Sequence, residues 1–99
     1  MIGDKDSCII CGTTLNLETH HCIGGSYKKK SDDLGMVVRV CSNCHTQDPD
    51  SIHRDPRARY KKLLQKLGQV WAMEHYGWTV DEFREKVGKN FFLTKVIAW

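Results

Sequence analysis

Four cysteines arranged as two Cys-x-x-Cys pairs restrict the possible folds of this chain more than any other feature. The pairs are Cys8 with Cys11 and Cys41 with Cys44. Two intervening residues let both sulfurs of a tight turn point at one ion, and two such turns complete the tetrahedron that structural zinc prefers. We therefore predict one structural zinc ion held by four thiolates, with no coordination position left open for catalysis.

The segment between the two pairs is unusually long. Twenty-nine residues separate Cys11 from Cys41, against about 15–20 in the ordinary pattern. The extra length carries His20, His21 and a lysine run, so the predicted zinc closes a longer, functional hairpin. The fifth cysteine, Cys22, has no partner at this spacing and is expected to be a small buried apolar residue.

Length and charge set further limits. The 99 residues predict a single domain over 1–99, near the lower size limit for folding without a metal or disulfides. Between His20 and Lys66, ten Lys and Arg face five Asp and Glu, whereas the remainder holds five against seven. This excess has the sign of a phosphate-binding surface, although charge alone favours a merely solvated face.

The ends and the apolar runs of the chain predict its compartment. The N-terminal residues are not followed by the apolar core of a signal peptide, and no stretch is long enough to span a bilayer. We expect a cytoplasmic protein without a membrane partner, in which cysteines are reduced or bound to metal.

Local patterns predict an α+β architecture. Residues 21–23 and the β-branched run 36–40 are expected to be extended, with a basic loop over 28–30 between them. Asp55 and Pro56 should cap and begin a long helix, and a capping box of Thr79 and Glu82 should begin a second one. The apolar tail 91–97 could form a strand or a packed extension. The apolar face expected for the long helix consists of Tyr60, Leu63, Leu64, Leu67, Val70 and Trp71.

Two adjacent histidines suggest a reactive site. Side chains alternate faces in an extended chain, so one imidazole could hold a metal while its neighbour faces a reacting water. Alone, His20-His21 would more simply be two surface residues. Their context is a Gly24-Gly25 turn, a predicted strand and then Val40-Cys41-Ser42-Asn43-Cys44-His45.

This combination resembles the HNH (ββα-metal) nuclease family over residues 8 to about 53, and it is similar to small HNH proteins of phages and prophages. The resemblance implies a zinc-stapled ββα-metal core over 8–54 with a C-terminal helical extension over 55–99. It also implies a divalent-metal-dependent DNA endonuclease or nickase that serves phage DNA processing or recombination, with Mg²⁺, Mn²⁺ or Ni²⁺ as the catalytic metal.

The resemblance also assigns roles to individual histidines. His20 and His45 become ligands of the catalytic metal, and His21 becomes the general base. His53 is a further candidate ligand, although it lies eight residues beyond His45 and a loop would have to bring it back. The family's middle asparagine corresponds to Met36 here, so Asp33 or Asn43 would have to take its place.

Basic residues on both sides of this site are candidates for contacts with the DNA backbone. Nothing in their pattern reads bases, so binding should be only weakly sequence-specific. The candidates are Lys28, Lys29, Lys30, Arg54 and Arg57.

Other functions fit parts of the pattern. Cys41-x-x-Cys44-His45 also matches a c-type haem attachment sequence, but this would leave the first cysteine pair unexplained. A zinc-ribbon module that binds nucleic acid without catalysis is the main alternative, and a zinc-stapled protein-interaction module is another. Neither of these needs a base beside a metal ligand.

Overall fold

A two-stranded antiparallel hairpin positions the histidines. The computed structural model describes residues 1–92. Strands β1 (Leu17–His21) and β2 (Val37–Cys41) pair so that His20 lies opposite Val38. The predicted strand is confirmed, whereas the first extended segment lies earlier than expected, ending at His21 instead of beginning there. Because side chains alternate along β1, His20 is buried and His21 is only half-buried.

The expected basic loop between the strands is wrong: it is a short helix. A 3-10 turn, η1 (Gly25–Tyr27), leads directly into α1 (Lys28–Leu34). An ion pair at 3.2 Å between Lys29 and Asp33, which lie one turn apart, stabilises the helical conformation of the lysine run. Gly35 ends the helix in the left-handed conformation, with φ of 81°.

The long helix begins later than predicted. Helix α2 (Arg59–Tyr76) follows a turn over 55–58 in which Ala58 has φ of 53°. The N-cap is Ala58, which makes no side-chain cap hydrogen bond, so the predicted cap at Asp55 and helix start at Pro56 are wrong. The Asp55 carboxylate instead accepts hydrogen bonds from the backbone N–H groups of Arg57 and Arg59, at 2.9 and 3.2 Å, and so holds the turn before the helix. The Arg59 guanidinium, also hydrogen-bonded to it, lowers the pKa of Asp55 to about 2.

The buried face of α2 also differs from the predicted apolar face. Leu63 is 59% exposed and Val70 41%, whereas Gly68 and Gln69 are buried. The reason is a close approach: a Cβ on Gly68 would lie 2.8 Å from the Cβ of Cys22. The helix therefore contacts the end of the hairpin at its glycine, which turns Leu63 and Val70 outward.

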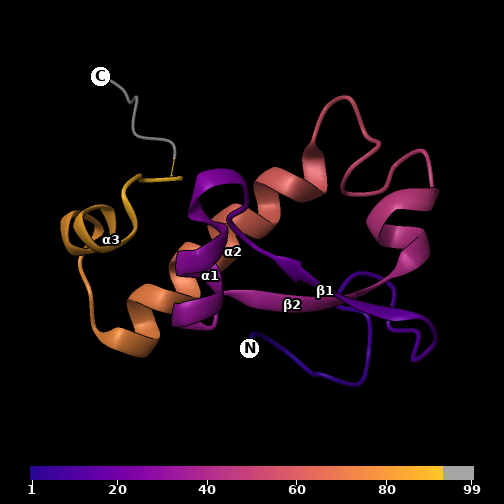
Figure 1. The fold of residues 1–99 in the computed structure, drawn as a ribbon, viewed down its shortest axis with the longest axis horizontal. Coiled ribbons are helices and arrows are strands. Elements are labelled where there is room, and N and C mark those ends of the chain that lie inside the picture. The colour runs from indigo at the N-terminus through magenta and orange to yellow at the C-terminus, as the bar shows by residue number, and fades with distance from the viewer. Residues whose placement is uncertain (93–99) are drawn as a thin grey trace, which may run out of the picture.

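Helix α3 (Val80–Val87) completes the described fold (Figure 1). Its predicted capping box is confirmed, since the Thr79 hydroxyl accepts from the Glu82 N–H and the Glu82 carboxylate accepts from the Thr79 N–H. Phe83 and Val87 are fully buried. Of the predicted apolar tail, residues 93–97 lie outside the described residues. In residues 1–92 no helix is both long and apolar enough to cross a membrane.

The hydrophobic core of this mixed α+β fold contains residues of the hairpin and of helices α2 and α3. Cys22, Val38, Leu64 and Phe83 belong to one cluster of buried residues. Cys22 is 2% exposed, and burial raises the pKa of its thiol to about 12. Its predicted role as a buried apolar residue is therefore confirmed.

Substituting Gly68 tests the helix–hairpin contact. Helix propensity alone predicts that Gly68→Ala stabilises the protein by about 1 kcal/mol. The 2.8 Å approach to Cys22 predicts the opposite sign, a loss of about 1–3 kcal/mol through overpacking. Urea unfolding of this variant, with exposed Lys66→Ala on the same helix as control, measures the difference. A more stable Gly68→Ala variant would show that α2 does not approach the hairpin this closely.

Candidate metal centres

The four paired cysteines converge at one point. Their sulfur atoms all lie within 4.8 Å of one another, and the sulfurs of Cys11 and Cys41 are 3.7 Å apart. Two thiolates bound tetrahedrally at about 2.3 Å from one zinc ion would be about 3.8 Å apart. The cluster of Cys8, Cys11, Cys41 and Cys44 therefore could bind structural zinc.

Backbone groups of the two turns support thiolate chemistry. The N–H of Cys11 points to the Cys8 sulfur at 3.5 Å, and the N–H of Cys44 points to the Cys41 sulfur at 3.4 Å. Burial opposes ionisation of Cys8, but hydrogen bonds from backbone N–H groups outweigh it and lower its pKa to about 6. Burial and the neighbouring sulfurs raise the pKa of Cys44 and the neighbouring sulfurs raise that of Cys11, so Cys8 is the thiol that ionises first, the form that binds a metal cation.

A second cluster contains three histidines. One ring nitrogen of each of His20, His45 and His53 lies within 4.8 Å of the others, and the Nε2 atoms of His45 and His53 are 3.1 Å apart. Two imidazoles bound about 2.1 Å from one ion, at angles between those of an octahedron and a tetrahedron, place their nitrogens about 3.0–3.4 Å apart. The observed separation matches that of two ligands of one metal ion.

Three separate segments bring these histidines together. His20 comes from β1, and His45 comes from η2 (Asn43–Gln47), a single π-helical turn. The chain then folds back, with the N–H of His53 donating to the carbonyl of His45 at 3.1 Å. The loop that His53 would need is therefore present.

His20 is the most informative member of this cluster. It is 7% exposed, and its Nε2 is buried without a hydrogen-bond partner among the described residues. Burial, reinforced by the neighbouring His45 and His53, lowers its pKa to about 4. His20 is thus a neutral imidazole with an unsatisfied buried nitrogen, which is the form that binds a metal ion and a costly one to leave unbound.

Two acidic residues at the site were missed by the sequence reasoning. The Glu18 carboxylate lies 2.7 Å from Nδ1 of His45, and the Asp32 carboxylate lies 2.8 Å from Nε2 of His21. Glu18 could have been found from strand periodicity, because it is two residues before His20 and shares its face. Asp32 could not, because its approach to His21 depends on the unpredicted helix α1.

These contacts also revise the expected partner of His21. Of the two candidates, Asp33 pairs with Lys29, and Asn43 begins the η2 turn. Met36, which the sequence resemblance aligned with the asparagine of HNH nucleases, is fully buried. His21 lies outside the three-histidine cluster and is oriented by Asp32 instead.

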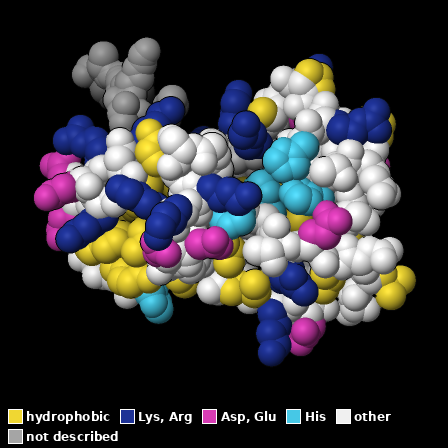
Figure 2. Space-filling view, in the orientation of Figure 1, with side chains coloured by type: hydrophobic (Ala, Val, Ile, Leu, Met, Phe, Trp, Pro, Cys, Tyr) yellow, Lys and Arg dark blue, Asp and Glu magenta, His cyan; other side chains and the backbone are white. Residues whose placement is uncertain are grey.

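The predicted basic residues lie unequally around the site. Lys28 lines a cavity together with His20, His21 and His45. Lys29 pairs with Asp33, and Lys30 donates to the carbonyl of Lys86. Figure 2 shows a group of histidine side chains on one face, with Lys and Arg side chains on either side of it, and one further histidine apart from the group at the lower edge. Arg54 and Arg57 are exposed near His53, and Arg54 donates to the carbonyl of Gln47.

Comparisons with protein-family models, with curated proteins and with solved structures found no match. The function must therefore be argued from the residues of the site.

The cysteine cluster predicts a zinc-dependent fold. We expect one zinc ion per chain, and Cys8→Ser or Cys44→Ser should lose it and unfold, because ligand binding and folding are linked. The matched control is Cys22→Ala, which removes a buried cysteine outside the cluster and should keep full zinc content. Elemental analysis and circular dichroism measure both properties. Folded wild-type protein that contains no zinc would contradict this prediction.

Proposed function

We propose that this protein is a metal-dependent DNA endonuclease or nickase of the HNH type. The observation that carries the proposal is the unsatisfied, buried Nε2 of His20, in a cluster where the Nε2 atoms of His45 and His53 lie 3.1 Å apart. A purely structural cluster would satisfy such a nitrogen within the protein. The adjacent His21, oriented by a carboxylate and outside the cluster, supplies a base next to that metal site.

Hydrogen bonding defines which nitrogen of His21 is reactive. An ionised carboxylate only accepts hydrogen bonds, so Nε2 of His21 carries the proton that points to Asp32. In the neutral imidazole the other nitrogen, Nδ1, is then free to accept a proton. In the proposed reaction, Nδ1 of His21 removes a proton from the water that attacks the phosphodiester.

A hydrogen bond to Glu18 likewise defines which nitrogen of His45 can bind a metal ion. Its Nδ1 donates to Glu18, which leaves the lone pair of Nε2 directed at the cluster. Carboxylates that orient metal-binding imidazoles in this way also increase the basicity of the ligand. A divalent cation held there would supply positive charge to stabilise the phosphate oxygens as the bond to the leaving group breaks.

The donor set narrows the choice of metal. Three imidazoles without a carboxylate among them favour borderline ions such as Ni²⁺ or Zn²⁺ over Mg²⁺, which prefers oxygen ligands. We therefore propose that Ni²⁺ or Zn²⁺ supports cleavage at lower concentration than Mn²⁺ or Mg²⁺ does. In the cysteine cluster, a separate zinc ion acts as scaffold, since four thiolates leave no open position.

The alternative is a zinc-ribbon module that binds nucleic acid without cutting it. The cysteine cluster and the basic side chains suit that function equally well. The three-histidine cluster favours the nuclease, because backbone binding needs neither a second metal site nor a carboxylate-oriented imidazole beside it.

Removing a cluster histidine tests the second metal site. We expect His45→Ala and His53→Ala to retain their zinc and fold, but to need more added Ni²⁺ or Mn²⁺ for half-maximal plasmid nicking. His75→Ala is the matched control, because His75 is exposed and stacks on Trp71 far along α2. A plasmid-nicking titration and calorimetry with the added metal measure the effect. Equal metal dependence in all three variants would argue against the site.

Substitutions of His21 and of the adjacent Asp32 and Asp33 test whether His21 is the general base. His21→Ala should reduce cleavage by roughly 10²–10⁴-fold, the usual effect of losing acid–base catalysis. Asp32→Asn should reduce it by about 10–100-fold through misorientation of His21, while Asp33→Asn, one residue along α1, should cut normally. Melting temperature and zinc content should be unchanged in all three. The nuclease proposal fails if wild-type protein nicks no DNA with any of these metals.

A further inference from the structure

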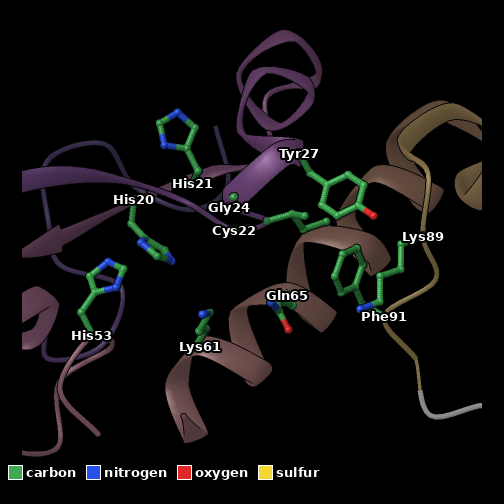
Figure 3. A pocket seen from close by; sticks show the side chains of 12 residues that line it. His20, His21, Cys22, Gly24, Tyr27, His53, Lys61, Gln65, Lys89 and Phe91 are labelled. Carbon is green, nitrogen blue, oxygen red and sulfur yellow. The ribbon is translucent and has the colours of Figure 1, made fainter. Parts of the chain in front are cut away.

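The histidine site opens into a cavity with a different chemical character at its far end. The cavity has a volume of about 270 Å³ and extends from His20, His21 and His53 to Tyr27 and Phe91. Figure 3 shows the histidines at one end and the two aromatic rings at the other, with Lys61 and Gln65 of α2 between them. Nothing in the proposed cleavage chemistry uses this aromatic end.

Buried contacts hold the aromatic end in place. The backbone N–H of Phe91 donates to Oε1 of Gln69 at 2.7 Å, and Nε2 of Gln69 donates to Oδ1 of Asn90 at 2.8 Å. Gln69 is fully buried, and a buried amide is costly unless it is hydrogen-bonded. This clamp explains the unexpected burial of Gln69 and fixes the segment after α3 beside the cavity.

The two rings leave aromatic surface facing the cavity. Tyr27 and Phe91 meet edge to face, with centroids 6.0 Å apart and planes at 90°, and both side chains are only half-buried. Because the rings are perpendicular, a flat ligand can stack on one of them but cannot insert between them. Gly88 leaves room for this pair, since a Cβ there would lie 3.0 Å from Tyr27.

The charges around the cavity select an anionic ligand. Lys61 and Lys89 line it, and the Lys89 ammonium lies over the ring of Phe91, 5.4 Å from its centroid, so a base stacked on that face would displace the ammonium. No Asp or Glu is among its described lining residues. Gln65 adds an amide that can both donate to and accept from the edge of a base. An aromatic platform with flanking lysines is the arrangement that binds a nucleobase and its phosphates in single strands.

We propose that this cavity binds one unpaired nucleotide next to the phosphate that is cut, with its base stacked on Phe91. A base within a duplex has both faces covered by its neighbours and must leave the stack to reach such a pocket. The preferred substrate is therefore DNA with a single-stranded gap, overhang or branch beside the cleavage point. The inference rests on the proposed function for the position of the cut phosphate, but binding can be measured without cleavage.

The test uses the 99-residue chain with one equivalent of zinc, the amount that the cysteine cluster would take, and no further divalent metal, so that the histidine cluster stays empty and no strand is cut. The probes are a duplex with a short single-stranded gap and the fully paired duplex of the same sequence. The gap carries a fluorescent adenine analogue whose emission is quenched by stacking. Phe91→Leu keeps an apolar side chain but removes the aromatic face, and Phe92→Leu, which does not line the cavity, is the matched control.

We expect wild-type protein and Phe92→Leu to bind the gapped duplex more tightly than the paired one and to quench the analogue. Phe91→Leu should bind the gapped duplex about 5–150-fold more weakly, the effect of losing one base–aromatic stack, with no quenching and unchanged affinity for the paired duplex. Equal affinity of wild type for both probes, or equal quenching by Phe91→Leu, would overturn the inference even if the protein is a nuclease. Selective quenching without any cleavage by metal-loaded wild type would instead retain the pocket and reject the nuclease.

Discussion

The convergence of four sulfurs is the constraint on which the other features depend. The antiparallel register places Leu17 opposite Cys41, so the first cysteine turn, which precedes β1, meets the second one at the end of β2. A zinc ion bound there would close the long segment between the two cysteine pairs, as a crosslink would. Such a link contributes most to the stability of a chain as small as this one. The hairpin, the η2 turn and the chain that leads to α2 all start from this junction.

The two candidate metal centres are built on the same short piece of backbone. Cys44 belongs to the sulfur cluster and the next residue, His45, belongs to the histidine cluster. The carbonyls of these two residues accept the N–H groups of Ile52 and His53, at 2.9 and 3.1 Å. The fold of the cysteine turn therefore fixes the direction of two of the three imidazoles.

The sequence predicted what local chemistry controls and missed what tertiary contacts control. The cysteine cluster, the strand before Cys41 and the Thr79 capping box follow from spacing and side-chain chemistry, and all are present. The lysine loop was wrong because the helix there is also held by non-local contacts, from the buried Ser31 hydroxyl to the carbonyl of Ile23 and from Lys30 to the carbonyl of Lys86. The face of α2 was wrong because hydrophobic periodicity counts Leu63 and Val70, whereas a glycine that fits against Cys22 decides which side is buried. The clamp made by Gln69 joins segments 21 residues apart and has no local signature.

The neighbouring positions of Cys44 and His45 have a consequence for how the protein would respond to its surroundings. Thiolates and imidazoles differ in softness, so the two centres would hold their ions with very different affinity and exchange them at different rates. A fall in the supply of free metal would empty the histidine cluster first, while the sulfur cluster kept the chain folded. The protein would then stay folded without the proposed cleavage activity. That activity would return when the histidine cluster took up metal again, without refolding or new synthesis.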